Sequence, residues 1–344
     1  MKFVIDEAVP FLEGVFEPYA ETVYKAGRNI CHDDLIDADA LIIRSRTRCT
    51  AELLEGTGIK IIATASIGTD HIDMEFCRNH GIYVQNASGS NAGGVMDYVF
   101  SALYGAAARK AIKLPGATFG IIGVGNVGSR VARMARALGF HVFMCDPPRA
   151  EKEHSTIFCD LDFLLQNSLI VSLHVPLTNA TRGMAGEDFF SQMLPGAVFI
   201  NTARGEIVDE AALKKAIPKL GSVIIDTWDH EPNVDKELID MVDIATPHIA
   251  GYSYQGKQNG TSAAVRAVAR FFGISALYDF FPKTPLKELE AVKLDVSRMD
   301  QGGIASVFQY NYPIFTDDFM FRMDPDSFET LRQEYKYRRE FYIE

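Results

Sequence analysis

Short apolar runs recur along this chain, and the segments between them carry apolar residues at helical spacing. In the first quarter of the sequence, four runs have the length of buried strands, at residues 2–5, 40–43, 59–64 and 82–85. Helical patterns lie between them, for example at 50–54 and 74–79. Strands that alternate with helices form a parallel sheet with helices on its faces. Residues 1–92 therefore predict a small α/β domain.

A second series of apolar runs follows a long helical pattern, rich in small residues, at 91–111. These runs predict a second parallel sheet, with strands at 118–122, 139–145, 169–174, 197–201, 222–226 and 243–245. The helical pattern at 261–272 is apolar on one face, and we expect that face to pack on the first domain. The sequence thus predicts two doubly wound parallel-sheet domains, a flavodoxin-like domain from 1–92 and 253–275, and a Rossmann domain from 93–252.

The remaining residues, 276–344, have a different character, with several prolines, many aromatic side chains and a charged helical pattern at 326–341. We expect them to form a small α+β C-terminal domain. The aromatic-rich segment 308–321 would expose apolar surface on a monomer, which predicts a homodimer formed through this region. The alternative is that this segment caps its own chain.

Three glycines, Gly123, Gly125 and Gly128, follow one of these strands with the spacing G-x-G-x-x-G and open a helical pattern. In a dinucleotide site the first glycine permits the turn, the second lets the backbone approach a pyrophosphate, and the third lets the helix pack close to the strand. Asp146 ends the next strand about 20 residues on, where a carboxylate would bond a ribose 2′-hydroxyl. This order predicts NAD as the cofactor, although the neighbouring Arg149 could accommodate the extra phosphate of NADP.

Polar residues follow three further strands of the expected Rossmann sheet: Arg204, Glu231 and His248. Ligands bind at the carboxyl ends of the strands in such a sheet. An arginine matches a carboxylate with its planar fork, and a histidine can take a hydroxyl proton. A glutamate can hold one tautomer of the histidine and favour its protonated form. Together the three residues suit the oxidation of a 2-hydroxy acid.

Each of these residues also has a simpler interpretation. Arg204 could form a surface ion pair, and His248 could be a hydrogen-bonded core residue. Their combination downstream of a dinucleotide fingerprint is what favours catalysis. His71 is interpreted as structural, whereas His174 ends another strand and is expected near the cofactor.

The formal net charge of −11 argues against nucleic acid or an anionic membrane as a general partner. The five cysteines form no C-x-x-C pair, so we expect neither a disulfide framework nor a metal site, and a reduced cytoplasmic setting fits best. The first residues read as a strand rather than a signal peptide, and no apolar run has the length of a membrane span. A small-molecule substrate is the partner that this composition allows.

Several motifs match one known family: G-V-G-N-V-G, C-D-P-P, H-V-P-L-T, N-T-A-R-G-E-I-V-D, D-x-x-x-x-E-P and P-H-I-A-G. With them the sequence resembles the D-2-hydroxyacid dehydrogenases. The resemblance implies that Arg204, Glu231 and His248 form the catalytic set, with His248 as the acid/base. It also implies NAD contacts at the glycine loop and the strand ends, namely Gly123, Gly125, Asn126, Val127, Gly128, Asp146, His174, Val175, Pro176, Ala203, Asp226 and Gly251.

A closer resemblance, to the branch of this family that oxidises a phosphorylated sugar acid, is carried by residues 4–10, 44–45, 63–73, 145–150, 248–252 and 337–341. It implies a phosphorylated hydroxy-acid substrate and a C-terminal dimerisation domain. Arginines and hydroxyl groups are suitable donors for a phosphate. The expected substrate-binding residues are Arg44, Ser45, Arg46, Ser66, Tyr252 and Arg338, of which Ser66 replaces a threonine of that branch.

Two other functions stay open at this point. A dehydrogenase for glycerate, phosphoglycerate or another D-2-hydroxy acid would use the same chemistry. A non-catalytic NAD(H)-sensing corepressor would keep the same three residues. The second alternative is disfavoured because the sequence has no long disordered flanks and no basic patches.

Overall fold

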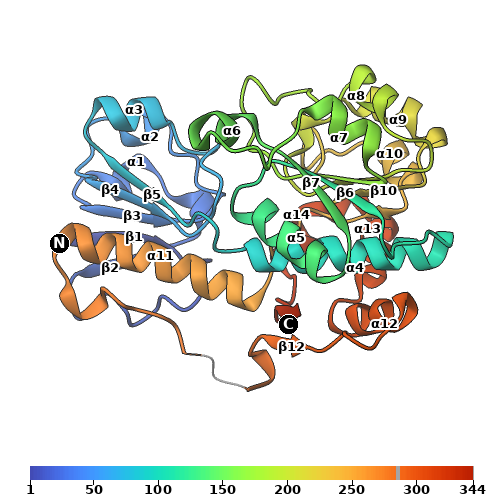
Figure 1. Ribbon diagram of the computed structural model, residues 1–344. Helices are drawn as coiled ribbons and strands as arrows, with labels where there is room; N and C mark the ends of the chain where they lie inside the picture. The colour runs from blue at the N-terminus through green and yellow to red at the C-terminus, as the bar shows by residue number, and fades with distance from the viewer. Residues whose placement is uncertain (284–286, 344) are drawn as a thin grey trace. The chain divides into compact units, whose positions relative to one another are not determined.

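The structure is a computed structural model that describes residues 1–283 and 287–343 (Figure 1). The chain divides into two compact units. Unit 1 consists of Met1–Asn91 and Ser253–Glu290, and unit 2 of Ala92–Tyr252 and Ala291–Glu344. This division does not test whether the C-terminal residues form a domain of their own, so the three-domain boundaries stay a prediction.

Unit 1 is built on a five-stranded parallel sheet with the order β2-β1-β3-β4-β5. Its strands are β1 (Lys2–Asp6), β2 (Glu21–Lys25), β3 (Ala40–Ile43), β4 (Ile61–Thr64) and β5 (Tyr83–Asn86). Four of them agree with the apolar runs, whereas the half-buried edge strand β2 was not expected. The strand order is the flavodoxin-like one, which confirms the predicted fold class for this unit.

Alternate residues of these strands face opposite layers, as the two-residue period of a strand requires. Phe3 and Ile5 pack with one layer, which includes Val265 and Val268 of α11 (Tyr254–Phe272). Val4 belongs to the opposite layer. The helices of that layer are α1 (His32–Leu35), α2 (Ala51–Leu54) and α3 (Met74–Asn79).

Unit 2 contains a six-stranded parallel sheet with the order β11-β10-β9-β8-β6-β7. The strands are β6 (Thr118–Ile122), β7 (His141–Cys145), β8 (Ile170–Leu173), β9 (Val198–Asn201), β10 (Ser222–Ile225) and β11 (Ile244–Ala245). The chain runs from β6 outward to β7 and then returns to β8 on the other side of β6. This reversal is the topological switch point at which such sheets bind nucleotides.

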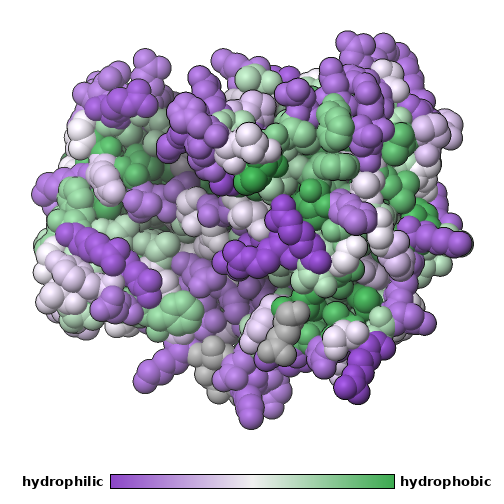
Figure 2. All heavy atoms as spheres, viewed as in Figure 1, coloured by the Kyte–Doolittle hydropathy of each residue, from purple (hydrophilic) through white to green (hydrophobic). Residues whose placement is uncertain are grey.

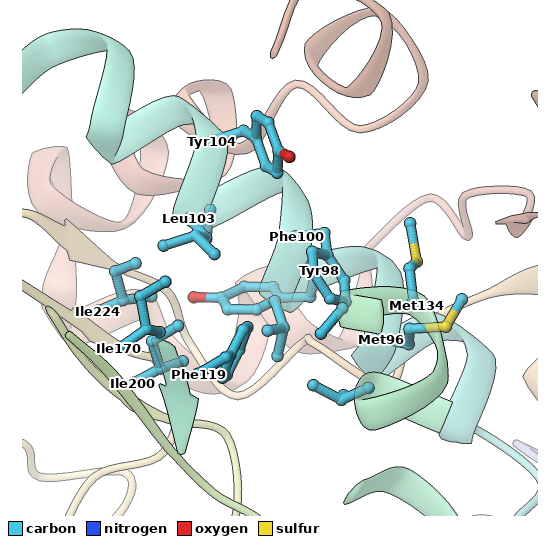
Figure 3. Close-up of a cluster of buried hydrophobic side chains, with 14 of the residues drawn as sticks. Met96, Tyr98, Phe100, Leu103, Tyr104, Phe119, Met134, Ile170, Ile200 and Ile224 are labelled. Atoms are coloured by element: carbon cyan, nitrogen blue, oxygen red, sulfur yellow. The ribbon is translucent and has the colours of Figure 1, made fainter. Parts of the chain in front are cut away.

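Helices cover both faces of the unit 2 sheet. On one face, α4 (Ala92–Lys110) and α5 (Asn126–Ala137) bury a cluster that includes Tyr98, Leu103 and Phe119 (Figure 3). The other face is buried by α7 (Leu161–Asn167), α8 (Glu187–Gln192), α9 (Glu210–Ala216) and α10 (Lys236–Met241). The remaining helix of this part is α6 (Pro147–Glu153), and short 3-10 turns lie at Gly27–Asn29, Gly205–Ile207, Ile217–Lys219, Ser275–Leu277, Lys287–Leu289 and Pro325–Ser327.

The C-terminal part of unit 2 has three helices and a two-stranded parallel sheet, as the α+β prediction requires. The elements are β12 (Val292–Leu294), α12 (Gln301–Asn311), α13 (Ile314–Met323), α14 (Phe328–Gln333) and β13 (Phe341–Ile343). The helix expected over 326–341 is wrong beyond Gln333. Phe341 instead pairs with Val292, and its backbone N–H donates to the Asp97 carboxylate at 2.8 Å.

Within 1–283 and 287–343, no helix is long and apolar enough to cross a membrane. Over the same ranges, no group of three or more histidine, cysteine or acidic side chains is arranged to hold a metal ion.

Candidate active site in unit 2

The glycine loop between β6 and α5 has the geometry of a dinucleotide cradle. Gly123 has φ +85°, and a Cβ there would lie 2.7 Å from the backbone of His174. A Cβ on Gly128 would lie 2.0 Å from the Gly123 carbonyl oxygen, so only glycine allows this approach of helix to strand. At Gly125, by contrast, a Cβ would meet nothing within 4 Å. Open space at the second glycine, beside the N–H groups of a helix start, fits a pyrophosphate.

We predict that Gly125→Ala and Gly128→Ala will have different effects. Gly128→Ala forces α5 away from β6, and overpacking of this kind costs about 1–3 kcal/mol of stability. Gly125→Ala keeps the wild-type melting temperature and weakens NAD binding, because its methyl group occupies the space for the phosphates. Thermal unfolding and NAD titration of both variants test the pair. A destabilised Gly125→Ala protein with normal NAD affinity would contradict this reading of the loop.

Asp146 ties the end of β7 to the glycine loop. One carboxylate oxygen accepts a hydrogen bond from the Val124 backbone N–H at 2.7 Å, and the other caps α6 by accepting from the Arg149 N–H at 3.1 Å. The side chain of Arg149 binds Glu153 through two hydrogen bonds, of 2.7 and 3.0 Å, and also donates to the Val124 carbonyl. This arrangement gives the arginine partners within its own loop and helix.

The end of β8 lies beside the same loop. The His174 backbone N–H donates to the Ile122 carbonyl of β6 at 2.7 Å, and its Nε2 lies 3.0 Å from the Ser172 hydroxyl. Burial lowers the pKa of His174 to about 3, so its imidazole is neutral. Val175 and Pro176 continue this segment next to Gly123, where the sequence predicts the cofactor.

The loop after β9 is held by the side chain of Asn201. Its amide group donates to the Arg204 carbonyl at 3.0 Å, and its oxygen accepts from the Ala203 N–H at 3.0 Å. A Cβ on Gly205 would lie 1.8 Å from the backbone of Trp228, so this loop and the loop after β10 are in close contact. Arg204, which is half-buried, is therefore fixed at its backbone on both sides.

Glu231 and His248 form a hydrogen-bonded pair, as expected from the sequence. The two carboxylate oxygens of Glu231 lie 2.8 and 3.1 Å from Nδ1 of His248, and one of them also accepts from the Trp228 N–H at 3.0 Å. A carboxylate only accepts hydrogen bonds, so Nδ1 carries the proton and Nε2 is the basic atom. Both side chains are partly exposed, His248 at 27% and Glu231 at 20%. The imidazole can thus exchange a proton with a ligand.

The loop that presents His248 is organised by the buried Asp226. Its carboxylate accepts from the Thr246 hydroxyl at 2.7 Å and from the N–H groups of Ile249 and Ala250 at 2.8 and 3.0 Å. His248 has φ +54°, a left-handed conformation that non-glycine residues adopt rarely and often at functional sites. These bonds hold the Asp226 carboxylate against the loop, and its contact with NAD stays a prediction.

The pKa values of the two acidic groups of this site shift in opposite directions. Burial raises the pKa of Asp226, and the nearby His248 charge and the loop hydrogen bonds offset only part of that rise. Burial also acts to raise the pKa of Glu231, but the charge and hydrogen bond of His248 and the charge of Arg332 hold it below its ordinary value. Glu231 is therefore ionised when the site works near neutral pH.

The C-terminal residues of unit 2 pack around Tyr252, which follows the His248 loop. The Tyr252 ring lies 5.9 Å from that of Tyr335, and the guanidinium of Arg332 lies 5.9 Å from the Tyr252 ring centre. Arg338 joins this group through Tyr335, because its Nε donates to the Tyr335 hydroxyl at 2.6 Å, and its guanidinium also binds both carboxylate oxygens of Asp317 at 2.8 and 2.9 Å. The sequence analysis missed Arg332 and Tyr335, for which no motif gives a signal.

Within unit 1, the expected substrate residues gather at one edge of the sheet. β3 and β4 pair in parallel with Ile43 opposite Thr64, so the loops that follow them start side by side. Arg44 donates to the Ala8 carbonyl at 3.2 Å. The hydroxyl group of Ser66 lies 2.6 Å from that of Thr64. Ser45 is exposed, and Arg46 is half-buried.

Comparison with known proteins identifies the family. Residues 97–250 match the model described as "D-isomer specific 2-hydroxyacid dehydrogenase, NAD binding domain". The chain is 40% identical over 347 residues to an erythronate-4-phosphate dehydrogenase of Bacteroides fragilis, covering 99% of this chain and 97% of the relative. It is 37% identical over 349 residues to the protein of the same name from Porphyromonas gingivalis, covering 99% and 94%.

Solved structures agree with this result. The NAD-bound 3-phosphoglycerate dehydrogenase of Entamoeba histolytica superposes with a TM-score of 0.67 at 28% identity, covering 83% of this chain and 99% of that one. The D-lactate dehydrogenase of Aquifex aeolicus, complexed with NAD and lactic acid, gives 0.65 at 27% identity, covering 83% and 100%. The nearly full-length match to relatives that share one enzyme name agrees with the Glu231–His248 pair and the glycine loop. This chain therefore belongs to the D-isomer specific 2-hydroxyacid dehydrogenases, with the erythronate-4-phosphate dehydrogenases among its relatives.

Proposed function

We propose that this protein oxidises 4-phospho-D-erythronate at C2 to the 2-oxo acid with NAD, as a step of pyridoxine biosynthesis. The observation that carries the proposal is the Glu231–His248 pair, which leaves a basic Nε2 on a loop beside an NAD-binding sheet. The choice of substrate is supported by relatives that are about 40% identical over almost the whole chain and bear this enzyme name.

NAD suits the residues that this unit presents. The cradle of Gly123, Gly125 and Gly128 would hold the pyrophosphate at the start of α5, and Asp146 would accept a hydrogen bond from the adenosine ribose. The further contacts that we propose lie along the same strand ends, at Asn126, Val127, His174, Val175, Pro176, Ala203, Asp226 and Gly251. When bound, NAD accepts the hydride that leaves C2 of the substrate.

The residues of the chain supply binding and proton transfer. Arg204 would hold the substrate carboxylate with its planar fork, which fixes the C2 hydroxyl group in place. Nε2 of His248 would then take the hydroxyl proton during oxidation and return it in the reverse reaction. Glu231 keeps the proton of the imidazole on Nδ1 and stabilises the imidazolium that forms.

The phosphate of the substrate needs donors in a protein with a net charge of −11. We propose Arg44, Ser45, Arg46 and Ser66 for this role, supported by their common position at the carboxyl edge of the unit 1 sheet. Tyr252 is proposed as a further contact. We also propose Arg338 as a phosphate donor, as the resemblance to dehydrogenases of phosphorylated sugar acids implies. To bind the phosphate, its guanidinium would have to release its hydrogen bonds to Asp317.

A panel of D-2-hydroxy acids tests the proposed substrate. The panel contains 4-phospho-D-erythronate, D-erythronate, D-glycerate and 3-phospho-D-glycerate, and the readout is the absorbance of reduced NAD. We expect the phosphorylated erythronate to have the highest kcat/KM. Equal turnover of unphosphorylated D-erythronate would reject the phosphate site, and NAD binding without turnover of any acid would favour a sensor.

We predict that NAD is preferred over NADP by about 10²-fold in kcat/KM, because Asp146 would face the 2′-phosphate with a like charge. Arg149 does not reverse this preference, since Glu153 and the Val124 carbonyl already bind it. The double variant Asp146→Ser, Glu153→Ala should improve the use of NADP, whereas Asp146→Ser alone should improve it less. Equal efficiency of the wild type with both cofactors would contradict the prediction.

We further propose a homodimer formed through the exposed apolar face of α13. Phe319, Met320 and Met323 on this helix are 59%, 50% and 67% exposed, and Tyr310 at the end of α12 is 83% exposed. Exposed apolar side chains are also visible beside α12 in the space-filling view (Figure 2). Apolar patches of this kind commonly mark interfaces between copies of a chain.

The mass in solution tests this dimer. We expect twice the chain mass at micromolar concentration, and a monomer for the variant Phe319→Glu, Met323→Glu, because buried charges would destabilise the interface. The matched control is Phe271→Glu, which places a charge at a 44% exposed aromatic residue of α11 and should leave the mass unchanged. A monomeric wild type would reject the proposal.

The five cysteines are all free, which supports a reducing compartment such as the cytoplasm for this protein.

A further inference from the structure

A buried arginine of the C-terminal segment lies close to the catalytic pair. The side chain of Arg332, on α14, is only 16% exposed. Its guanidinium carbon lies 5.5 Å from the ring centre of Phe328 and 5.9 Å from that of Tyr252. Arginine is rarely buried without a partner of opposite charge, since desolvation of its charge is costly. The charged and polar groups around Arg332 therefore indicate the role of its positive charge.

The hydrogen bonds around Arg332 do not account for its burial. One terminal nitrogen lies 3.5 Å from the Glu329 carboxylate, at the outer limit of a hydrogen bond. Its Nε is buried and has no hydrogen-bond partner among the residues that the structure describes. Glu329 is itself 30% exposed, so this ion pair is partly screened by solvent. A second electrostatic interaction must stabilise the cation.

Packed aromatic rings and electrostatic interactions both connect Arg332 to the catalytic loops. Phe328, against which Arg332 packs, contacts Phe321, and Phe321 contacts Trp228 with ring centres 5.7 and 5.8 Å apart. Trp228 donates its backbone N–H to the Glu231 carboxylate. The groups that act electrostatically on Arg332 are the Tyr252 phenol and the carboxylates of Glu231, Glu329 and Asp226.

The charges of the site explain why a fixed cation is useful there. Two carboxylates, the buried Asp226 and the partly exposed Glu231, lie beside one imidazole that must change between neutral and positive during the reaction. When His248 is neutral, it gives these carboxylates no positive charge. Arg332 gives them a positive charge in both states. Although burial acts to lower the pKa of Arg332, the surrounding groups raise it above its ordinary value, so the residue stays charged.

We propose that Arg332 is a positioning residue of the active site, a permanent buried cation supplied by α14 that keeps Glu231 ionised while the imidazole of His248 gives up its proton. The inference rests on the proposed dehydrogenase function. It makes the C-terminal segment a part of the catalytic machinery of its own chain. It also assigns a task to a residue that belongs to no motif of the family fingerprint.

The test uses three single variants of the full-length enzyme. Arg332→Gln removes the charge at similar size, and Arg332→Lys keeps it. Glu329→Gln is the matched control, because it alters the surface partner of the arginine and leaves the cation in place. For each protein, kcat/KM for oxidation is measured against pH. The histidine titration of the apo enzyme is followed by NMR, with His248→Asn to assign the signal, and thermal unfolding shows that each variant is folded.

Loss of the cation that acts on Glu231 leaves the negative charge of this carboxylate less compensated, which makes protonation of the paired imidazole more favourable. We expect Arg332→Gln to move the midpoints of the acidic kinetic limb and of the NMR titration to higher pH, by about one unit. Arg332→Lys should restore most of the wild-type position, and Glu329→Gln should not move it upward. Oxidation measured below the wild-type midpoint should fall about tenfold in Arg332→Gln, and at high pH it should approach wild type.

Two outcomes would overturn the inference. If Arg332→Gln keeps both midpoints and only loses thermal stability, the arginine is a packing residue. If it keeps both midpoints and raises KM, the arginine is a substrate ligand. A wild-type enzyme without turnover would count against the proposed function instead, and the NMR titration would still decide the role of Arg332.

Discussion

Replacement of His248 is expected to lower kcat by about 10²–10⁴-fold, the usual contribution of a positioned acid/base, and to leave NAD affinity nearly unchanged. The expectation follows from the pairing of its Nδ1 with Glu231, which makes Nε2 the group that moves the substrate proton. His248→Asn is the preferred variant, because asparagine tolerates the left-handed backbone at φ +54° better than alanine. Steady-state oxidation with NAD and an NAD titration measure the two quantities.

His230 provides the matched control for this experiment. It lies next to Glu231, also has a positive φ, and its side chain is 83% exposed. His230→Asn should therefore turn over substrate like the wild type. Glu231→Gln should retain partial activity with an altered acidic limb of the pH–rate profile, since the amide cannot stabilise the imidazolium. Wild-type rates in both His248→Asn and Glu231→Gln would refute the catalytic pair.

Arg204→Lys is expected to lower kcat/KM by roughly 10²–10³-fold, which corresponds to about 3–4 kcal/mol. A lysine keeps the charge and loses the planar fork that binds both carboxylate oxygens. The fold should survive, because the Arg204 loop is held by Asn201 and by the close contact of Gly205 with Trp228, neither of which needs the guanidinium. Kinetics over a range of substrate concentrations, together with thermal unfolding, measure the effect.

Chemical rescue makes the Arg204 test specific. Arg204→Ala should regain part of its activity when guanidinium ions are added at millimolar concentration, whereas Arg204→Lys should not respond. Arg133→Lys, on the exposed side of α5, is the control and should behave like the wild type. Activity of Arg204→Lys within threefold of the wild type would show that this residue does not bind the carboxylate.

Much of this architecture follows from local sequence. The apolar runs predict β3 and β6 with the bounds that the structure gives them, because central parallel strands are buried on both faces and read as continuous apolar segments. The glycine spacing predicts the turn at Gly123 and the close packing at Gly128, since a residue with a Cβ would clash with the backbone at both positions. The order of the strands then places Glu231 and His248 on neighbouring loops.

Other features depend on contacts between distant parts of the chain. The edge strand β2 has charged ends and no buried residue, so it carries no continuous apolar signal, and its pairing with β1 decides its conformation. The charged helical pattern at 326–341 ends at Gln333, because Arg338 binds Asp317 and Phe341 is bound by Asp97 and β12. These tertiary interactions outweigh a helix propensity that amounts to less than about 1 kcal/mol per residue.

The candidate site likewise has some features that the sequence predicts and others that depend on tertiary contacts. Arg204, Glu231 and His248 could be predicted because each follows a strand within a motif, and strand ends converge in a parallel sheet. The bonds of Asp226 to the His248 loop and the burial of Arg332 near Glu231 could not be predicted. The sequence alone thus determined the sheets, the glycine loop and the Glu231–His248 pair. Only the tertiary structure decided which buried charges surround that pair, because a side chain's electrostatic partners depend on distances that local sequence does not encode.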